Sequence, residues 1–221
     1  MNLHRKLEIC SVFLFLIGLA FLVNKALPLF VVSLAEKPWM SSAYLILSLG
    51  TGYIFADFLS GMVHFLCDNF GDEETAYFGP AFIQPFRMHH TDPSDITKHD
   101  FFETNGNTCL VVLPVMGIYY FVSDGLSVWV SFSFLFSVTS VVFTNQFHKW
   151  AHLENPPRWI RVLQISGMIL PKTMHSLHHT PPFSSYYCIT CGWLNPLFEF
   201  VKFFPKMKTS IESVLIANRQ K

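Results

Sequence analysis

Charged residues are scarce in this chain of 221 residues. Asp, Glu, Lys and Arg together make up 14% of the sequence, and the formal net charge is zero, whereas soluble domains carry about 25% charged residues. Without a positive excess there is no electrostatic basis for binding nucleic acid, so we expect no nucleic-acid partner. Hydrophobic residues reach 51% and come in long blocks, which indicates an integral membrane protein.

A disulfide framework is also missing. The five cysteines are an odd number at irregular spacing, which is not the pattern of a disulfide-stapled domain. Cys188 and Cys191 form a single C-x-x-C without a second pair. We interpret them as two buried thiols in preference to a metal or redox site.

The apolar blocks predict an all-α fold with about four transmembrane helices. We expect these spans at residues 9–35, 40–68, 108–122 and 126–147. The first should bend near Pro28. It could instead be a signal peptide cleaved after Ala35, and the later segments would then lie on the same sides of the membrane. A helix over the 29 residues of the second block would be about 43 Å long, while the hydrocarbon core is about 30 Å thick. Its polar C-terminal end should therefore emerge from the bilayer.

The remaining segments are predicted to lie outside the hydrocarbon. Residues 71–107 form a long polar connection rich in Pro and Gly, and loops of this length are usually functional or disordered. Residues 159–170 combine Arg161 with apolar neighbours, which favours a helix in the membrane interface. The aromatic stretch 183–204 should pack against the membrane face, and the tail from Pro205 should be a short, basic, solvated end.

Histidines are concentrated in four groups near the predicted span ends. In the H-x-x-H-H stretch at His175, His178 and His179, the three rings share one helical face. Asp57, Gly61, His64 and Asp68 form a stripe along the end of the second span. The remaining histidines of this kind are His89, His90, His99, His148 and His152. These nine imidazoles predict a metal centre, because neutral imidazole is the commonest metal ligand in proteins.

With four spans, all nine histidines lie on one side of the membrane. Of the fifteen Lys and Arg residues, only Lys25, in the outer part of the first span, and Lys37, in the first external loop, are assigned to the external side; the second external loop has none. The positive-inside rule therefore predicts a cytoplasmic, histidine-rich cap.

Nine imidazoles exceed the three or four ligands of one zinc site, so the sequence predicts two metals. Imidazole suits iron, zinc, copper and nickel alike, so the ligand type does not choose the metal. A histidine-rich site at the bilayer surface is suited to oxidising a lipid chain, and that reaction needs a redox metal, which zinc is not. A membrane zinc hydrolase and a non-enzymatic haem or metal carrier remain alternative classes. The chain has no Glu-x-x-His motif of the carboxylate di-iron bundles.

The motifs resemble the Kua family of lipid desaturases, which includes the plasmanylethanolamine desaturase that makes plasmalogens. The matching stretches are Asp57-x-x-x-Gly61-x-x-His64-x-x-x-Asp68, Phe86-Arg-x-His89-His90, Ile96-Thr-x-His99-Asp100-Phe-x-Glu103-Thr-Asn105-Gly106, Thr144-Asn-Gln-x-His148-Lys-Trp-x-His152, Leu170-Pro, His175-x-x-His178-His179 and Tyr187-Cys-Ile-Thr-x-Gly192-Trp-x-Asn195. The resemblance covers about residues 50–197 and implies a single membrane-embedded lipid desaturase domain over 1–221. Plant chloroplast phosphatidylglycerol desaturases look like a more distant branch.

The resemblance implies an iron- and oxygen-dependent desaturase acting on a membrane phospholipid. Its electrons would come from a donor such as cytochrome b5 or a ferredoxin, and two Fe ions with dioxygen would carry the oxidation. The reaction would convert the ether-linked alkyl chain of plasmanylethanolamine to a vinyl ether, with acyl-chain desaturation of phosphatidylglycerol or another phospholipid as the rival. The protein would lie in the endoplasmic reticulum of a eukaryote or the inner membrane of a bacterium.

Residue roles follow from the same resemblance. The nine histidines would ligate two irons, with His99 the first to be dropped because it is single and outside the helix-end groups. Asp57, Asp68 and Asp100 are candidates to orient ring N–H groups, and Asn105 and Glu103 to complete a ligand sphere or touch the headgroup. Arg87, Lys98, Lys149 and Lys172 would hold a phosphate or dock an acidic electron carrier, or are ordinary positive-inside charge.

Overall fold

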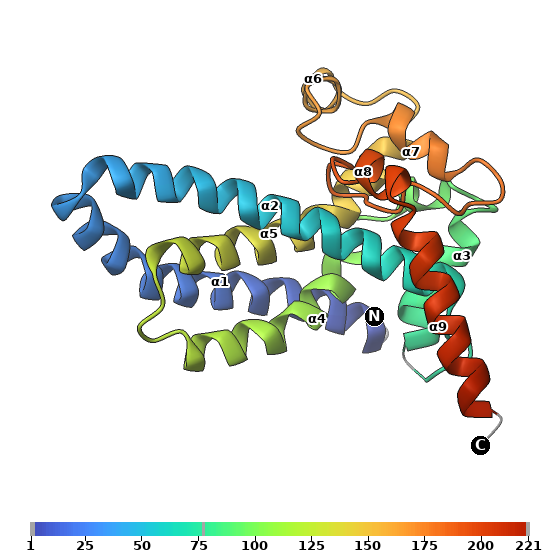
Figure 1. The fold of residues 1–221 in the computed structure, drawn as a ribbon, viewed down its shortest axis with the longest axis horizontal. Helices are drawn as coiled ribbons and strands as arrows, with labels where there is room; N and C mark the ends of the chain where they lie inside the picture. The colour runs from blue at the N-terminus through green and yellow to red at the C-terminus, as the bar shows by residue number, and fades with distance from the viewer. Residues whose placement is uncertain (1–2, 77, 220–221) are drawn as a thin grey trace. The chain divides into compact units, whose positions relative to one another are not determined.

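The computed structural model describes residues 3–76 and 78–219, and none of these residues forms a strand. The helices are α1 (Leu3–Glu36), α2 (Pro38–Asn69), the π-helix η1 (Gly79–Ile83), α3 (Gln84–His89), the 3₁₀-helix η2 (Asp95–Lys98), α4 (Phe101–Val122), α5 (Val128–His152), α6 (Arg158–Ile165), α7 (Lys172–His178), α8 (Asn195–Phe200) and α9 (Phe203–Arg219) (Figure 1). The predicted all-α fold is confirmed.

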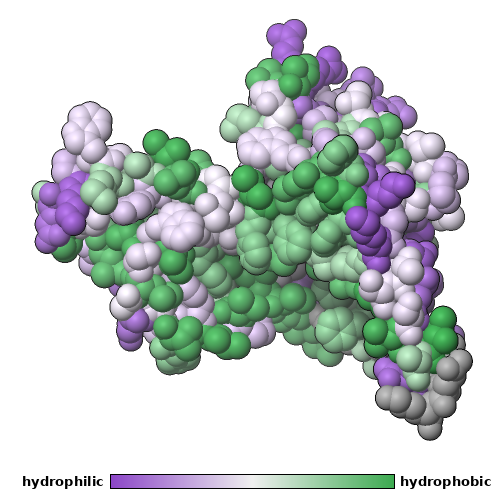
Figure 2. Space-filling view, viewed as in Figure 1, coloured by the Kyte–Doolittle hydropathy of each residue, from purple (hydrophilic) through white to green (hydrophobic). Residues whose placement is uncertain are grey.

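Four helices, α1, α2, α4 and α5, are long and apolar enough to cross a membrane, as predicted. They keep large apolar side chains exposed, among them Ile46, Ile118 and Phe121, and hydrophobic residues are prominent on their visible surface (Figure 2). Lipid satisfies such a surface, while the helix satisfies its own backbone polar groups. The chain is therefore an integral membrane protein.

Two segments differ from the sequence prediction. Helix α1, by contrast, includes Pro28 within one continuous helix, and the predicted bend there stays a prediction. Helix α4 begins at Phe101, not near residue 108, because Asp100 caps it: the Asp100 Oδ1 atom accepts a hydrogen bond from the backbone N–H of Glu103 at 3.0 Å. The segment after Pro205 is not a short solvated end, because it belongs to helix α9, whose Phe204, Met207 and Ile211 pack into an apolar core.

The chain divides into two compact units, each with its own core. Unit 1 comprises residues up to 56 together with 97–149, and unit 2 comprises residues 57–96 together with those from 150 onward. In unit 1, α1 packs along α4. Gly106 permits this approach, since a Cβ there would lie 2.7 Å from the Cα of Glu8, and the Ser11 hydroxyl donates to the Gly106 carbonyl at 2.7 Å.

Unit 2 is built around the C-terminal half of α2. Phe65, Tyr187, Cys188 and Phe204 form its buried apolar cluster. Gly61 lets the 187–192 segment come close to α2, because a Cβ there would lie 2.5 Å from the sulfur of Cys188. The predicted stripe along α2 therefore has its glycine where another segment of unit 2 packs against the helix.

Candidate metal centre

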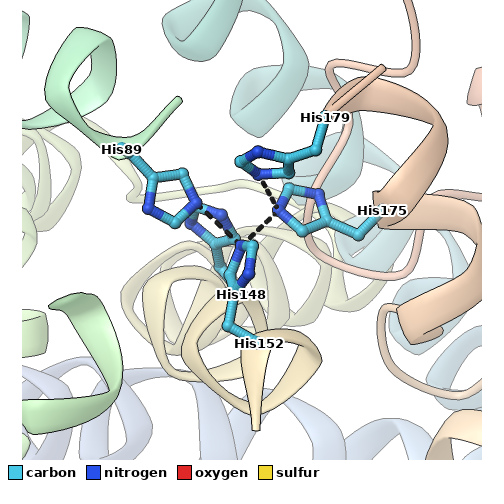
Figure 3. Close-up of side chains that lie close together, drawn as sticks. All are labelled: His89, His148, His152, His175 and His179. Carbon is cyan, nitrogen blue, oxygen red and sulfur yellow. Dashed lines mark hydrogen bonds between the residues drawn. The ribbon is translucent and has the colours of Figure 1, made fainter. Parts of the chain in front are cut away.

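Eight histidines and one aspartate form two groups with metal-ligand spacing. The ligand atoms within each group lie within 4.8 Å of one another. The five-histidine group comprises His89 at the end of α3, His148 and His152 on α5, and His175 and His179 at α7 (Figure 3). The aspartate group comprises His64 and Asp68 on α2, His90 after α3, and His178 on α7. Neighbouring histidines of one motif thus enter different groups.

The ring nitrogens of the five-histidine group converge closely. The Nε2 atom of His152 lies 2.7 Å from the Nε2 atoms of both His89 and His175, and that of His179 lies 3.0 Å from that of His175. The Nε2 atom of a neutral imidazole carries either one N–H or one lone pair, so a single proton or a single lone pair on His152 would have to serve both neighbours. A cation at the point of convergence would instead be bound by every one of these lone pairs, so the residues fit a metal.

The aspartate group is spaced differently, and Asp68 is its centre. Its Oδ2 atom lies 3.5 Å from Nε2 of His64, 3.5 Å from Nε2 of His90 and 3.6 Å from Nε2 of His178. The carboxylate is 5% exposed, and neither of its oxygens accepts a hydrogen bond within the described part of the chain. Two ligands about 2.1 Å from a tetrahedral metal are about 3.4 Å apart. The separations therefore match ligands of one ion better than hydrogen-bonded pairs.

Backbone carbonyls set the tautomers of two rings in this group. The Nδ1 atom of His178 lies 2.7 Å from the carbonyl oxygen of Ser185, and that of His64 lies 3.1 Å from the carbonyl oxygen of Tyr187. A carbonyl only accepts hydrogen bonds, so each Nδ1 carries the proton and each Nε2 is left as the ligand atom. Metal-binding histidines are held in this way in known sites.

Electrostatics keep the rings of α3 and α7 neutral. Burial, followed by the neighbouring imidazoles, lowers the pKa of His89 to about 2 and that of His179 to about 4. Burial also lowers the pKa of His178 to about 3, although the Ser185 carbonyl favours the protonated ring. These histidines are therefore in the metal-binding form at neutral pH, since only the neutral ring binds a metal.

Comparison with known proteins agrees with this centre. The family model of the lipid desaturase domain matches residues 53–219. The chain belongs to the lipid desaturase family. It is 45% identical over 170 residues to a plasmanylethanolamine desaturase of Myxococcus xanthus, covering 76% of this chain and 60% of that one. It is 40% identical over 185 residues to plasmanylethanolamine desaturase 1 of Mus musculus, covering 80% and 68%.

A more distant plant relative follows. The chain is 31% identical over 160 residues to the chloroplastic fatty acid desaturase 4 of Arabidopsis thaliana, covering 71% of this chain and 48% of the plant protein. The matched part of the chain thus spans 48% to 68% of the length of these relatives. No solved structure matches it significantly. The predicted resemblance to a lipid desaturase family is confirmed.

In this member of the lipid desaturase family, Asp57 contacts backbone amides of the 190–194 turn. Its Oδ1 atom accepts hydrogen bonds from the N–H groups of Cys191 at 2.9 Å and Gly192 at 2.8 Å, and Oδ2 accepts from Leu194 at 3.1 Å. Gly192 adopts a positive φ of 76° that favours glycine. Asp57 was predicted to orient a ring N–H; the structure shows it holding a turn of the segment whose carbonyls orient His64 and His178.

Arg87 also has a structural set of partners. Its Nε atom donates to the carbonyl of Cys67 at 3.2 Å, and Nη2 donates to the carbonyls of Phe70 at 3.1 Å and Gly71 at 3.2 Å. It therefore satisfies carbonyls at the C-terminal end of α2, where a cation is also favoured by the helix dipole. The guanidinium joins the helix of His89 to the end of the helix of Asp68, so these contacts do not support the predicted phosphate or carrier contact.

The other predicted site residues between 97 and 149 lie outside the two ligand groups. Neither histidine group contains His99, whose Nε2 atom lies 3.7 Å from Oε1 of Glu103. Asp100 caps α4 and pairs with Arg5, which lowers the pKa of its carboxyl. The buried Asn105 donates from Nδ2 to Oε1 of Gln146 at 3.2 Å. The structure thus gives Asp100 a helix-capping position and Asn105 a helix-packing one.

Lys149 and Lys172 contact backbone carbonyls, and Cys188 and Cys191 are the two buried thiols that the sequence predicted. Lys149 donates to the carbonyl of His99 and Lys172 to that of Leu153. Cys188 and Cys191 are buried, and burial raises the pKa of both thiols. Sequence reasoning missed the carbonyls of Ser185 and Tyr187 that orient the rings, because every residue has a backbone carbonyl and residue identity does not reveal its role. The only signal was the position of Tyr187 within one of the matching motifs.

Proposed function

We propose that this lipid desaturase holds two iron ions, one in each ligand group, and converts the ether-linked alkyl chain of plasmanylethanolamine to a vinyl ether. The observation that carries the proposal is the pair of adjacent ligand groups on α2, α3, α5 and α7. The names of the bacterial and mouse relatives supply the substrate. Removing two hydrogens from the alkyl chain, with dioxygen, two electrons and two protons, leaves two waters.

The ligand assignment follows the two groups. His64, Asp68, His90 and His178 would hold one iron, and His89, His148, His152, His175 and His179 the other. When bound, the two irons would supply the activation of dioxygen needed to break an unactivated C–H bond, and a carrier such as cytochrome b5 or a ferredoxin would supply the electrons. Zinc has no redox chemistry, so the zinc hydrolase is the weaker alternative.

The protein's own residues keep the ligands in place. The carbonyls of Ser185 and Tyr187 hold His178 and His64 with Nε2 directed into the group. Asp57 fixes the turn that follows these carbonyls, and Arg87 fixes the end of α2. Because His64 and His178 are fully buried, bulk water is excluded from their side of the site.

Helix length favours a substrate bond near the headgroup. Helix α2 has 32 residues and α5 has 25, or about 48 Å and about 38 Å, against a hydrocarbon core of about 30 Å. Their ligands lie in the last turns, so the irons should sit near headgroup depth. A bond next to the ether oxygen reaches that depth while the alkyl tail stays in lipid. The same argument admits an acyl bond near the ester, as in a phosphatidylglycerol desaturase, which is the runner-up.

Sidedness and domain organisation complete the proposal. We place the metal centre on the cytoplasmic face, in the endoplasmic reticulum of a eukaryote or the inner membrane of a bacterium, on the distribution of Lys and Arg. Cysteines introduced at Lys37 and Asp124 should then label from outside intact cells, and one at Lys98 only after permeabilisation. External labelling at Lys98 would reverse the assignment.

Because α2 and α5 each run from one unit into the other, we treat residues 1–221 as one desaturase domain with its motifs within 50–197.

The substrate is tested by expressing the chain in cells that lack a plasmalogen desaturase. Lipid mass spectrometry, with acid lability as the vinyl-ether test, should show plasmanylethanolamine converted to plasmalogen, and His178→Ala should abolish the product. Unconverted plasmanyl lipid together with a new double bond near an acyl ester would select the runner-up. Full activity with stoichiometric zinc would rule out the iron desaturase.

A further inference from the structure

Helix α6 has one buried face and a second, apolar face that is exposed. Ile160 and Gln164 point into unit 2 and are almost inaccessible, at 2% and 7% exposure. Trp159, Val162 and Ile165 follow the i, i+3, i+6 spacing of a different face and are 54%, 64% and 80% exposed. Three large apolar residues on one exposed stripe are unfavourable in water, and such patches usually mark an interaction surface.

The position of α6 on the fourth span places this stripe at the membrane interface. The Trp150 ring, in the last turn of α5, makes an edge contact with the Trp159 ring at 5.0 Å between centroids. The Gln164 side chain donates to the Trp150 carbonyl at 3.2 Å. Since α5 is about 38 Å long and the hydrocarbon core about 30 Å thick, we expect its last turn at headgroup depth, and α6 contacts that turn through Trp150.

A second set of exposed apolar residues lies on α8 and in the turn before it. The Trp193 indole N–H donates to the carbonyl of Gly167, just after α6, at 2.7 Å. Leu197 and Phe200 lie three residues apart on helix α8, Trp193 lies in the turn before it, and all three are exposed. The hydrogen bond holds Trp193 beside the C-terminal end of α6. The two sets of exposed apolar residues are together called here the apolar ledge: Trp159, Val162, Ile165, Trp193, Leu197 and Phe200.

Charge next to the ledge points to lipid. Arg158 and Arg161 are both exposed on α6, and Figure 2 shows hydrophilic surface next to hydrophobic surface over α6. Arginine beside tryptophan is typical of helices that lie in the headgroup region, where the ring is buried at the boundary and the cation meets phosphate. A twofold contact between two copies through α6 would instead bring two pairs of arginines into one interface, where like charges repel.

We propose that the apolar ledge is a bilayer-docking surface, which inserts into the headgroup–acyl boundary of the membrane that the four long helices cross. Phospholipid is its partner, through apolar contact by the ledge and phosphate contact by Arg158 and Arg161. This inference depends on the chain being an integral membrane protein and is independent of the reaction catalysed.

The test uses single spin labels on the full chain in phosphatidylcholine–phosphatidylglycerol nanodiscs. Cysteines replace Val162 or Phe200 on the ledge, or Thr173, an exposed polar position on α7, as the control; Cys10→Ser removes the exposed native thiol. Collision rates with apolar oxygen relative to a water-soluble nickel chelate should be several-fold higher at Val162 and Phe200 than at Thr173.

Two outcomes would overturn the proposal. Chelate accessibility at Val162 and Phe200 equal to that at Thr173 would place the ledge in water. A short label-to-label distance between two chains, together with protection that persists in detergent, would show that a second copy covers the ledge. Iron content measured on each labelled protein separates a misfolded variant from a folded one.

Discussion

Asp57 and His64 lie two turns apart on the same helix, and the same loop forms hydrogen bonds with both of their side chains. Asp57 accepts hydrogen bonds from the amides of the 190–194 turn, and the carbonyl of Tyr187, just before that turn, lies 3.1 Å from Nδ1 of His64. The carboxylate therefore fixes a loop that in turn fixes a ligand ring on the carboxylate's own helix. The same loop orients His178 through Ser185.

This relationship predicts the effect of Asp57→Asn. The amide keeps one acceptor oxygen but loses the negative charge and presents an NH2 group to the N–H of Leu194. Because a hydrogen bond to a charged group contributes about 1.5–3 kcal/mol, the free energy of unfolding should fall by at least about 2 kcal/mol. Thermal unfolding in detergent measures this loss of stability, and iron content measures whether the loop still orients His64 and His178. Asp72→Asn is the matched control, since Asp72 is exposed and its turn contact to Glu74 tolerates an amide oxygen; an unfolding temperature equal for both variants would contradict the role given to Asp57.

Asp68→Ala should remove one iron and leave the other. Asp68 contributes the only carboxylate among the described candidate ligands, and its Oδ2 faces the rings of His64, His90 and His178 at 3.5–3.6 Å. The five-histidine group does not include it. Iron analysis of purified protein should therefore fall from about two ions per chain to about one, with desaturation lost. Retention of both ions would mean that Asp68 is not a ligand.

His99→Ala should keep both irons. His99 belongs to neither histidine group and lies against Glu103 instead, so its removal takes no ligand from the metals. The variant should bind iron as the parent does, while His152→Ala, changed in the same way, should lose it. A drop in iron content of the His99 variant equal to that of the His152 variant would restore His99 to the ligand set.

The sequence was sufficient to predict features that depend on residue type. Long apolar blocks predicted the four spanning helices, and the spacing of His148 with His152 and of His175 with His179 predicted shared helical faces. Whether the grouped side chains ligate metal stays a prediction.

Features that depend on tertiary contact escaped sequence reasoning. No pattern indicates that His89 and His90 separate into two groups, because that depends on where α3 ends. Nor does a sequence show that backbone carbonyls, not carboxylates, orient His64 and His178. The early start of α4 depends on the Asp100 cap, whose side chain had been assigned to the histidines.

The substitution Arg87→Lys, which keeps the positive charge, distinguishes two possible roles of Arg87. If the guanidinium holds a substrate phosphate, lysine keeps the charge, and the main effect should be a higher KM. The structure instead shows Arg87 reaching the carbonyls of Cys67, Phe70 and Gly71, which a single ammonium group on a flexible stem cannot match in geometry. We therefore expect Arg87→Lys to lower iron content and unfolding temperature and to reduce kcat while KM stays near the parent value. Lys172→Arg is the control, because Lys172 makes one carbonyl contact with Leu153 and should tolerate the change. A selective rise in KM for Arg87→Lys, with iron and stability unchanged, would show that Arg87 binds the headgroup.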